Sequence, residues 1–144
     1  MNKNEELVVY TLQNSQMGID TLLHLGQATN DGQFSALLQQ QRGDLLQINS
    51  SAKRLLVEAG YVDRELPLMA KLASRLVLHD QIEEDPSVDH LARLLLRHHQ
   101  VGMLDADKVL KKYRTADPIY KDLVETLAAL EVAHAGQLSP WLHH

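Results

Sequence analysis

Apolar residues recur at spacings of three and four over several long stretches of this chain, and this periodicity limits the fold most strongly. In residues 33–59 the pattern is carried by Phe34, Leu38, Leu45 and Ile48. Such spacing places the apolar side chains on one face of an α-helix. No stretch of Val, Ile, Thr or Tyr alternates with the period of two that marks a half-buried strand. The sequence therefore predicts an all-α fold.

Turn and capping signals divide the periodic pattern into four long helices. Asp117 followed by Pro118 offers an N-cap residue and a proline at the first helical position, and Asp85 with Pro86 repeats this signal. Gly60 is suited to a helix C-terminus because glycine accepts positive φ. The long helices are expected over about residues 5–29, 33–59, 86–113 and 118–138.

The segment from residue 60 to residue 85 is too long for a turn between two helices. It contains an apolar helical piece that is expected from Leu66 and Pro67 to about His79. A connection of this length can travel along a bundle whose helices are ~37 Å long. The sequence thus predicts an antiparallel four-helix bundle with a long crossover that carries a short extra helix, so that the second and third long helices are parallel. The two helical hairpins cover about residues 5–59 and 86–139.

The helical phase assigns residues to the inside and the outside of the bundle. In the first helix the expected inner residues are Val8, Val9, Leu12, Ile19 and Leu23. Five apolar residues project from the expected outer faces: Leu7, Met17, Leu25, Leu46 and Leu104. This is more apolar surface than a monomeric bundle needs, so self-association into a homo-oligomer is predicted.

Composition and charge exclude several classes of function. With 44% apolar content the chain can build one sizeable core, so residues 1–144 are predicted to form a single domain. A net charge of -5 argues against a nucleic-acid partner, because duplex binding needs a concentrated basic face. No apolar run approaches the ~20 residues that cross a bilayer, and no signal-peptide pattern is present, which predicts a cytoplasmic protein without a membrane partner. His143 and His144 carry no weight, because a purification tag could also supply them.

Two hairpins, a crossover with its own short helix and the motif Glu131-Val-Ala-His134 resemble the ferritin-like superfamily over nearly the whole chain. A narrower resemblance, to small uncharacterised bacterial bundle proteins of that type, is carried by Met17-Gly18-Ile19-Asp20, Met69-Ala70-Lys71, Val101-Gly102-Met103 and Lys112-Tyr113 with Ala116-Asp117. The superfamily resemblance implies a two-iron site with a Glu on helices one and three and a Glu-x-x-His on helices two and four. Only the fourth position is present here, because the other inward polar positions hold Gln16, Gln41 with Asp44 three residues on, and His99. An intact two-iron centre is therefore not expected.

Polar residues on the inner faces of the last two long helices form the candidate site. At 100° per residue, Glu131 and His134 point inward from the last helix and His99 points inward from the helix before it. His99 and Glu131 also lie at similar heights, ~22 and ~21 Å from the turn between their helices. Two imidazoles and a carboxylate suit zinc or non-haem iron, with Gln16 and Gln41 as hydrogen-bond donors around the ligands. The same side chains could instead form a polar cluster that fixes the helix register.

Two hypotheses follow for the function. The first is a ferritin-like bundle without catalytic activity, which acts through its surface as an interaction or assembly protein. The second is a metal-binding protein that holds iron or zinc at the degenerate site of His99, Glu131 and His134. The first hypothesis is favoured, because a helical Glu-x-x-His is a short motif that often occurs by chance. No nucleophile beside a base and no glycine-rich phosphate loop is apparent, so no catalytic residue is predicted. Asp20 and His24, four residues apart on a helix, are expected to form a solvated face.

Overall fold

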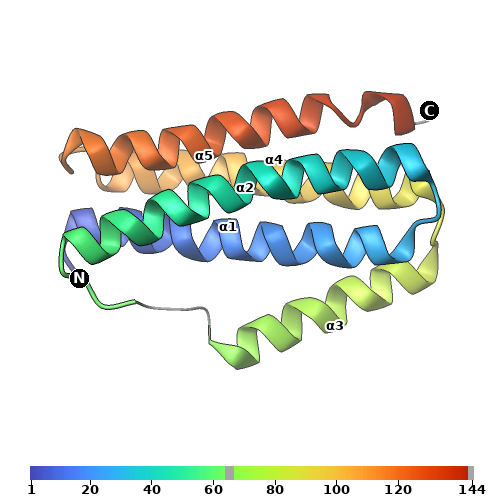
Figure 1. Cartoon of the computed structure of the whole chain (residues 1–144), viewed down its shortest axis with the longest axis horizontal. Helices are drawn as coiled ribbons and strands as arrows, with labels where there is room; N and C mark the ends of the chain where they lie inside the picture. Colours follow the sequence, from blue (N-terminus) through green and yellow to red (C-terminus); the bar gives the residue numbers. More distant parts are fainter. Residues whose placement is uncertain (64–66, 143–144) are drawn as a thin grey trace.

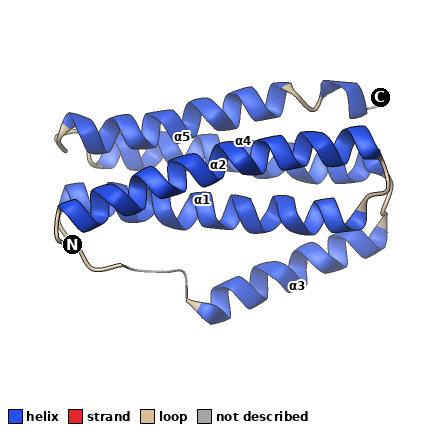
Figure 2. Cartoon of the chain, viewed as in Figure 1, coloured by secondary structure: helices blue, strands red, loops and turns tan. Residues whose placement is uncertain are grey.

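The computed structural model describes residues 1–63 and 67–142, except the side chain of Leu68, and no strand occurs among these residues (Figure 2). The described part of the chain folds into five α-helices and a final 3-10 turn: α1 Lys3–Ala28, α2 Gly32–Glu58, α3 Leu68–Glu84, α4 Val88–Lys112, α5 Pro118–Gly136 and η1 Ser139–Trp141. The prediction of an all-α fold is confirmed. Leu66, His143 and His144 lie outside the described residues.

Helices α1, α2, α4 and α5 lie side by side, and α3 connects one hairpin to the other (Figure 1). The helices within each hairpin, α1 with α2 and α4 with α5, run in opposite directions. Helix α3 returns along α1, so that α2 and α4 run in the same direction, as the length of the crossover predicted. It is longer than expected, since it continues past His79 to Glu84. None of the described helices contains an apolar stretch of membrane-spanning length.

Two Asp-Pro pairs were predicted to begin the helices of the second hairpin, and only one of them does so. Asp117 and Pro118 begin α5 as predicted. At α4, however, Ser87 is the N-cap in place of Asp85, and its Oγ accepts a hydrogen bond from the His90 amide at 3.3 Å. Asp85 Oδ1 instead accepts from the Ser87 amide at 3.0 Å, which forms a local turn before the helix. The helix therefore begins two residues later than predicted.

The apolar core forms two clusters that lie along different halves of α1. The cluster at the C-terminal half of α1 includes Leu22, Leu25, Phe34, Leu45 and Leu95. The cluster at its N-terminal half includes Leu7, Val8, Leu56, Ala106 and Val124. Full burial of one Leu, Val or Phe side chain is worth about 1.5–3 kcal/mol, so these clusters supply the main force that holds the helices together.

The buried face of α1 is wider than the helical phase predicted. Leu7 and Leu25, expected on the outside, are fully buried, whereas Leu23, expected on the inside, is 38% exposed. The reason is that α1 contacts α2, α3, α4 and α5, which cover much of its circumference. Leu46 and Leu104 are exposed, at 44% and 63%. The apolar outer surface that motivated self-association is thus smaller than predicted.

Candidate functional site

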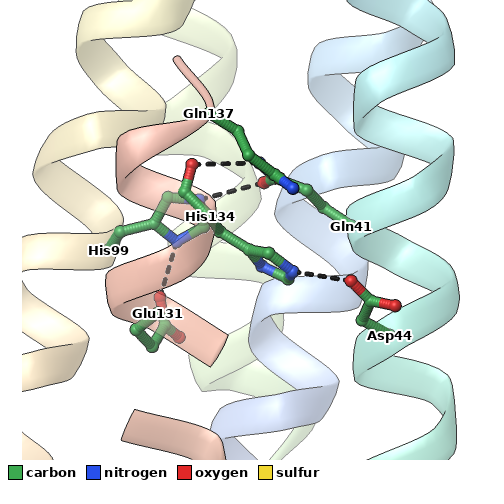
Figure 3. Close-up of polar contacts among 6 residues, drawn as sticks. All are labelled: Gln41, Asp44, His99, Glu131, His134 and Gln137. Carbon is green, nitrogen blue, oxygen red and sulfur yellow. Dashed lines mark hydrogen bonds and ion pairs between the residues drawn. The ribbon is translucent and has the colours of Figure 1, made fainter. Parts of the chain in front are cut away.

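The polar residues that were predicted to point inward are buried, with one exception. His99 and His134 are each 1% exposed, Glu131 is 6% exposed and Gln41 is fully buried. They belong to α4, α5 and α2 and meet between these helices (Figure 3). Gln16, expected in the same group, is half-buried and lines a separate cavity between α1, α3 and α4.

His99 and Glu131 form a buried pair between α4 and α5. His99 Nδ1 lies 2.5 Å from Glu131 Oε2, so the two side chains share a short hydrogen bond. Gly102 leaves room for this carboxylate, because a Cβ atom at that position would lie 3.0 Å from Glu131 Cδ and 3.1 Å from Oε1. A larger residue at position 102 would therefore push the carboxylate away from His99.

Gln41 connects this pair to the end of α5. Its Nε2 donates to the backbone oxygen of His134 at 3.1 Å and to Gln137 Oε1 at 3.0 Å (Figure 3). Because a backbone oxygen only accepts, the amide nitrogen of Gln41 must face α5 and its Oε1 must face His99. His99 Nε2 lies 3.0 Å from that oxygen, so this ring nitrogen carries a proton and donates it.

These partners determine the net charge of the buried pair. With Nε2 of His99 protonated, the proton in the short bond sits either on Nδ1 or on Glu131. The first placement gives an imidazolium with a carboxylate, and the second gives a neutral imidazole with a carboxylic acid. In both cases the pair carries no net charge, which lowers the cost of burying it in an apolar interior.

His134 has one partner and one free nitrogen. Its Nε2 donates to Asp44 Oδ2 at 2.9 Å, and the Asp44 side chain is 37% exposed. Its Nδ1 is buried and has no hydrogen-bond partner in the described part of the chain. With the proton on Nε2, the unpartnered group on Nδ1 is a lone pair rather than an N–H donor. His134 therefore stabilises the contact between α5 and α2.

Asp44 and Gln137 were not predicted as site residues. Each follows a predicted residue by three positions, Asp44 after Gln41 and Gln137 after His134, and this spacing puts both members of a pair on the same helix face. That spacing was the available signal. The interior cluster is defined here as Gln41, Asp44, His99, Glu131, His134 and Gln137.

The interior cluster does not fit a two-iron centre. Such a centre relies on several carboxylates to neutralise and bridge the metal ions, whereas here Glu131 is paired with His99 and Asp44 contacts His134. Both ring nitrogens of His99 are hydrogen-bonded. Within residues 1–63 and 67–142 no three His, Cys, Asp or Glu side chains are grouped so that they could hold a metal ion. The predicted ligands are thus neighbours, but His134 points its Nε2 at Asp44 rather than at the other two.

A second polar region lies between α1, α3 and α4, where the structure has a cavity of about 490 Å³. Its apolar lining includes Met17, Leu25, Leu78 and Leu94. The sequence did not predict this cavity, because its existence depends on where α3 lies against α1 and α4. Its polar lining includes Gln16, Asp20, His24, Lys71, Arg75, Arg97 and His98.

The charged side chains of the cavity differ in their partners. Arg75 Nη2 lies 3.0 Å from Asp20 Oδ2, an ion pair that joins α3 to α1. His24 Nδ1 lies 2.9 Å from the backbone oxygen of Asp20, so both residues of the expected solvated pair take part in the cavity wall. The side chains of Lys71 and Arg97 form no hydrogen bond or ion pair with any described residue.

His98 lies between the two polar regions. It lines the cavity, and its ring centroid is 5.9 Å from that of His99. Burial lowers the pKa of His98 below its usual value of 6.5, because the charged ring loses its hydration; the charge of Glu131 opposes this shift and that of His99 adds to it. At about pH 7 His98 is therefore neutral. It offers the cavity a hydrogen-bonding group without a charge.

Comparisons with protein-family models, with curated proteins and with solved structures found no match. The ferritin-like resemblance therefore remains a prediction from the motifs and the topology. The function has to be inferred from the interior cluster and from the cavity.

Proposed function

We propose that this protein acts by binding rather than by catalysis, and that the cavity between α1, α3 and α4 holds a small molecule. The observation that supports this most strongly is the cavity itself, at about 490 Å³. Small-molecule sites typically enclose about 300–1,000 Å³ and combine an apolar lining with a few polar groups. Leucine and methionine side chains, with Lys71, Arg97 and His98 among them, give the cavity this character.

The interior cluster supports a binding function in a different way. Most of its donors and acceptors are used on one another, since His99 binds both Glu131 and Gln41, and Gln41 binds two groups of α5. A general base or nucleophile needs an atom that faces a substrate. The cluster instead links α2, α4 and α5, so we assign it to fixing the register of these helices.

Helix α3 provides a route into the cavity. None of its described side chains is fully buried, although Leu78 and Ile82 pack partly against the core. An element with so little buried surface separates from the rest of a protein at low cost in free energy. Movement of α3 away from α1 and α4 would admit a ligand without opening the four-helix part of the molecule.

Binding to the cavity can be tested with N-phenyl-1-naphthylamine, a neutral dye that fluoresces in apolar surroundings. We expect saturable binding that Thr21→Trp weakens by about tenfold or more, because an indole ring from α1 would occupy part of the cavity. Gln47→Trp, on the exposed face of α2, is the matched control and should bind dye like the wild type. Circular dichroism confirms that both variants fold. Equal dye affinity in the wild type and in folded Thr21→Trp would contradict the proposal.

Two finer proposals follow from the topology and the surface. The parallel course of α2 and α4, produced by the crossover helix, supports a bundle of ferritin-like type. The exposure of Leu46 and Leu104, together with Met69 and Leu76 on α3, supports self-association into a homo-oligomer. Sedimentation at micromolar concentration tests the second of these, and a strict monomer would contradict it.

The metal-binding hypothesis retains one supporting observation, the unpartnered Nδ1 of His134, which is a potential ligand for zinc or iron. Metal binding by His99, Glu131 and His134 would require them to exchange their present partners. If they do bind metal, Glu131→Gln should abolish metal uptake and make the variant less stable than the metal-loaded wild type. This difference in stability should disappear when a chelator removes the metal from the wild type. If Glu131 only accepts hydrogen bonds, the variant should lose about 1–3 kcal/mol with or without chelator. Thermal melts with elemental analysis of untagged protein separate these outcomes.

A further inference from the structure

We propose that the ligand of the cavity is an amphipathic organic anion, with a carboxylate or phosphate head held by Lys71 and Arg97 and an apolar body against the leucine side chains. This inference rests on the proposed function, because it names the chemical class of the molecule that the cavity binds. It goes beyond that function by assigning the polar end of the ligand to two particular side chains.

The charge of the cavity is opposite to that of the whole molecule. Lys71, Arg75 and Arg97 contribute three positive charges to the lining and Asp20 contributes one negative charge. The chain as a whole carries a net charge of -5. A positive region on an acidic protein attracts small anions to one place rather than to the general surface. The sign of the ligand charge therefore follows from this local excess.

Two of the three cations are available to a ligand. Arg75 is already paired with Asp20, at 3.0 Å. The side chains of Lys71, which is half-buried on α3, and of Arg97, which is exposed on α4, have no partner in the described part of the chain. A carboxylate or phosphate between them would accept charge-assisted hydrogen bonds from two different helices. It would also join α3 to α4, which the Arg75–Asp20 pair does not do.

The remaining lining indicates that the ligand has more than a charged head. Met17, Leu25, Leu78 and Leu94 present apolar side chains to the same space. A small inorganic anion would leave this surface in contact with water, whereas a hydrocarbon or aromatic body would bury it, at about 25 cal/mol for each Å² covered. His98 lines the cavity as a neutral ring, so it does not select for a second charged group on the ligand.

A cationic or uncharged ligand fits these observations less well. A cation would face Lys71 and Arg97, and like charges at close range repel each other. An uncharged apolar ligand would displace water from Lys71 without giving the ammonium group a partner, which is costly in a half-buried position. An anionic head removes both penalties.

The test uses the full chain and three ligands with the same ten-carbon body: decanoate, decyl phosphate and the uncharged decanol. Each competes with N-phenyl-1-naphthylamine for the cavity. We expect at least one of the two anions to bind about tenfold or more tightly than decanol. The difference should shrink as salt is raised, because salt screens charges that are partly exposed. Comparison of decanoate with decyl phosphate identifies which head the site prefers.

Substitutions of Lys71 and Arg97 test whether these two side chains bind the charged head of the ligand. Lys71→Gln and Arg97→Gln should each weaken the binding of the preferred anion by about fivefold or more and leave the affinity for decanol unchanged. Arg97→Lys, which keeps the charge, should retain most of the affinity, and it also serves if Arg97→Gln does not fold. Lys53→Gln, on an exposed face of α2 away from the cavity, is the matched control and should have no effect.

The outcomes separate this inference from the proposed function. Dye binding that Thr21→Trp weakens, combined with equal affinities for decanoate, decyl phosphate and decanol, would overturn the anion inference and leave the proposed function intact. An anion preference that survives both Lys71→Gln and Arg97→Gln would overturn the assignment of the head. Failure of the dye and of all three ligands to bind would overturn the proposed function and the inference together.

Discussion

The interior cluster and the cavity each collect polar side chains from three helices, but they differ in how those side chains are partnered. In the interior cluster, Gln41, His99 and Glu131 are hydrogen-bonded to one another and to α5. In the cavity, Lys71 and Arg97 have no partner among the described residues. The first region has little capacity for a ligand, whereas the second has charge and space for one.

The difference follows from the helices that build each region. Helix α5 packs against both α4 and α2, and polar groups enclosed between these helices must bind each other because water is excluded. Helix α3 covers α1 without burying any of its described side chains completely, so a space is left beneath it. In this protein, buried polar residues therefore indicate a structural role for the region that contains them and do not indicate a ligand site.

The largest expected effect is on the interior cluster. Glu131→Ala removes the partner of His99 and leaves a buried polar ring uncompensated, so the free energy of unfolding should fall by about 3–5 kcal/mol. Urea denaturation measures it. Glu125→Ala, at an exposed position of the same helix, should change stability by about 0.5 kcal/mol or less. A loss below about 1 kcal/mol for Glu131→Ala would show that the cluster does not hold the bundle together.

A smaller loss is expected at the glycine beside this carboxylate. Gly102→Ala places a Cβ atom about 3.0 Å from Glu131 Cδ, so the carboxylate must shift from His99; this should outweigh the ~0.5–1 kcal/mol that alanine gains over glycine in a helix and leave a net loss of about 1 kcal/mol. Gly43→Ala, with nothing within 4 Å, should stabilise α2 by about 0.5–1 kcal/mol. In a Glu131→Ala background the cost of Gly102→Ala should largely disappear. Additive effects in that double variant would contradict the contact.

His98, which lies between the two regions, should make stability depend on pH. Its pKa in the folded chain is below the usual 6.5, because burial disfavours the charged ring. The folded state therefore binds fewer protons than the unfolded state, and the free energy of unfolding should fall as the pH drops below about 6.5 and through the lower folded-state pKa. His98→Gln should reduce this slope in urea titrations between about pH 7 and pH 5. An unchanged slope would place the pH dependence on other groups.

The smallest effect on global stability is expected at the cavity. Asp20→Asn breaks a partly exposed ion pair with Arg75, so the free energy of unfolding should change by about 1 kcal/mol or less. Amide hydrogen exchange should nevertheless speed up in α3, while α5 stays protected. Asp122→Asn, at an exposed position of α5, is the control and should leave exchange in α3 unchanged. Equal exchange of α3 in the wild type and in Asp20→Asn would show that this pair does not hold the helix.

Much of the interior cluster could be predicted from the sequence. The angle and height of His99, Glu131 and His134 follow from regular helix geometry, and these residues are buried as expected. The spacing of three indicated that Asp44 and Gln137 share the helix faces of Gln41 and His134, but the contacts that they make depend on how two helices are offset, which the spacing does not give. Gln16 was placed in the wrong region, because a half-buried position on α1 faces either the interior or α3 and the sequence does not distinguish them.

The sequence by itself determined where the helices are, since propensity, capping and apolar periodicity act within a few residues. The all-α fold, the turn at Gly60 with its φ of +74° and the start of α5 at Asp117 belong to this category. Only the tertiary structure decided which side of α1 is covered, as the burial of Leu7 and Leu25 shows. It also decided that the space beneath α3 is a cavity in which the side chains of Lys71 and Arg97 have no partner among the described residues. The physical reason is that burial and ion pairing depend on contacts between segments far apart in the chain, which local periodicity does not encode.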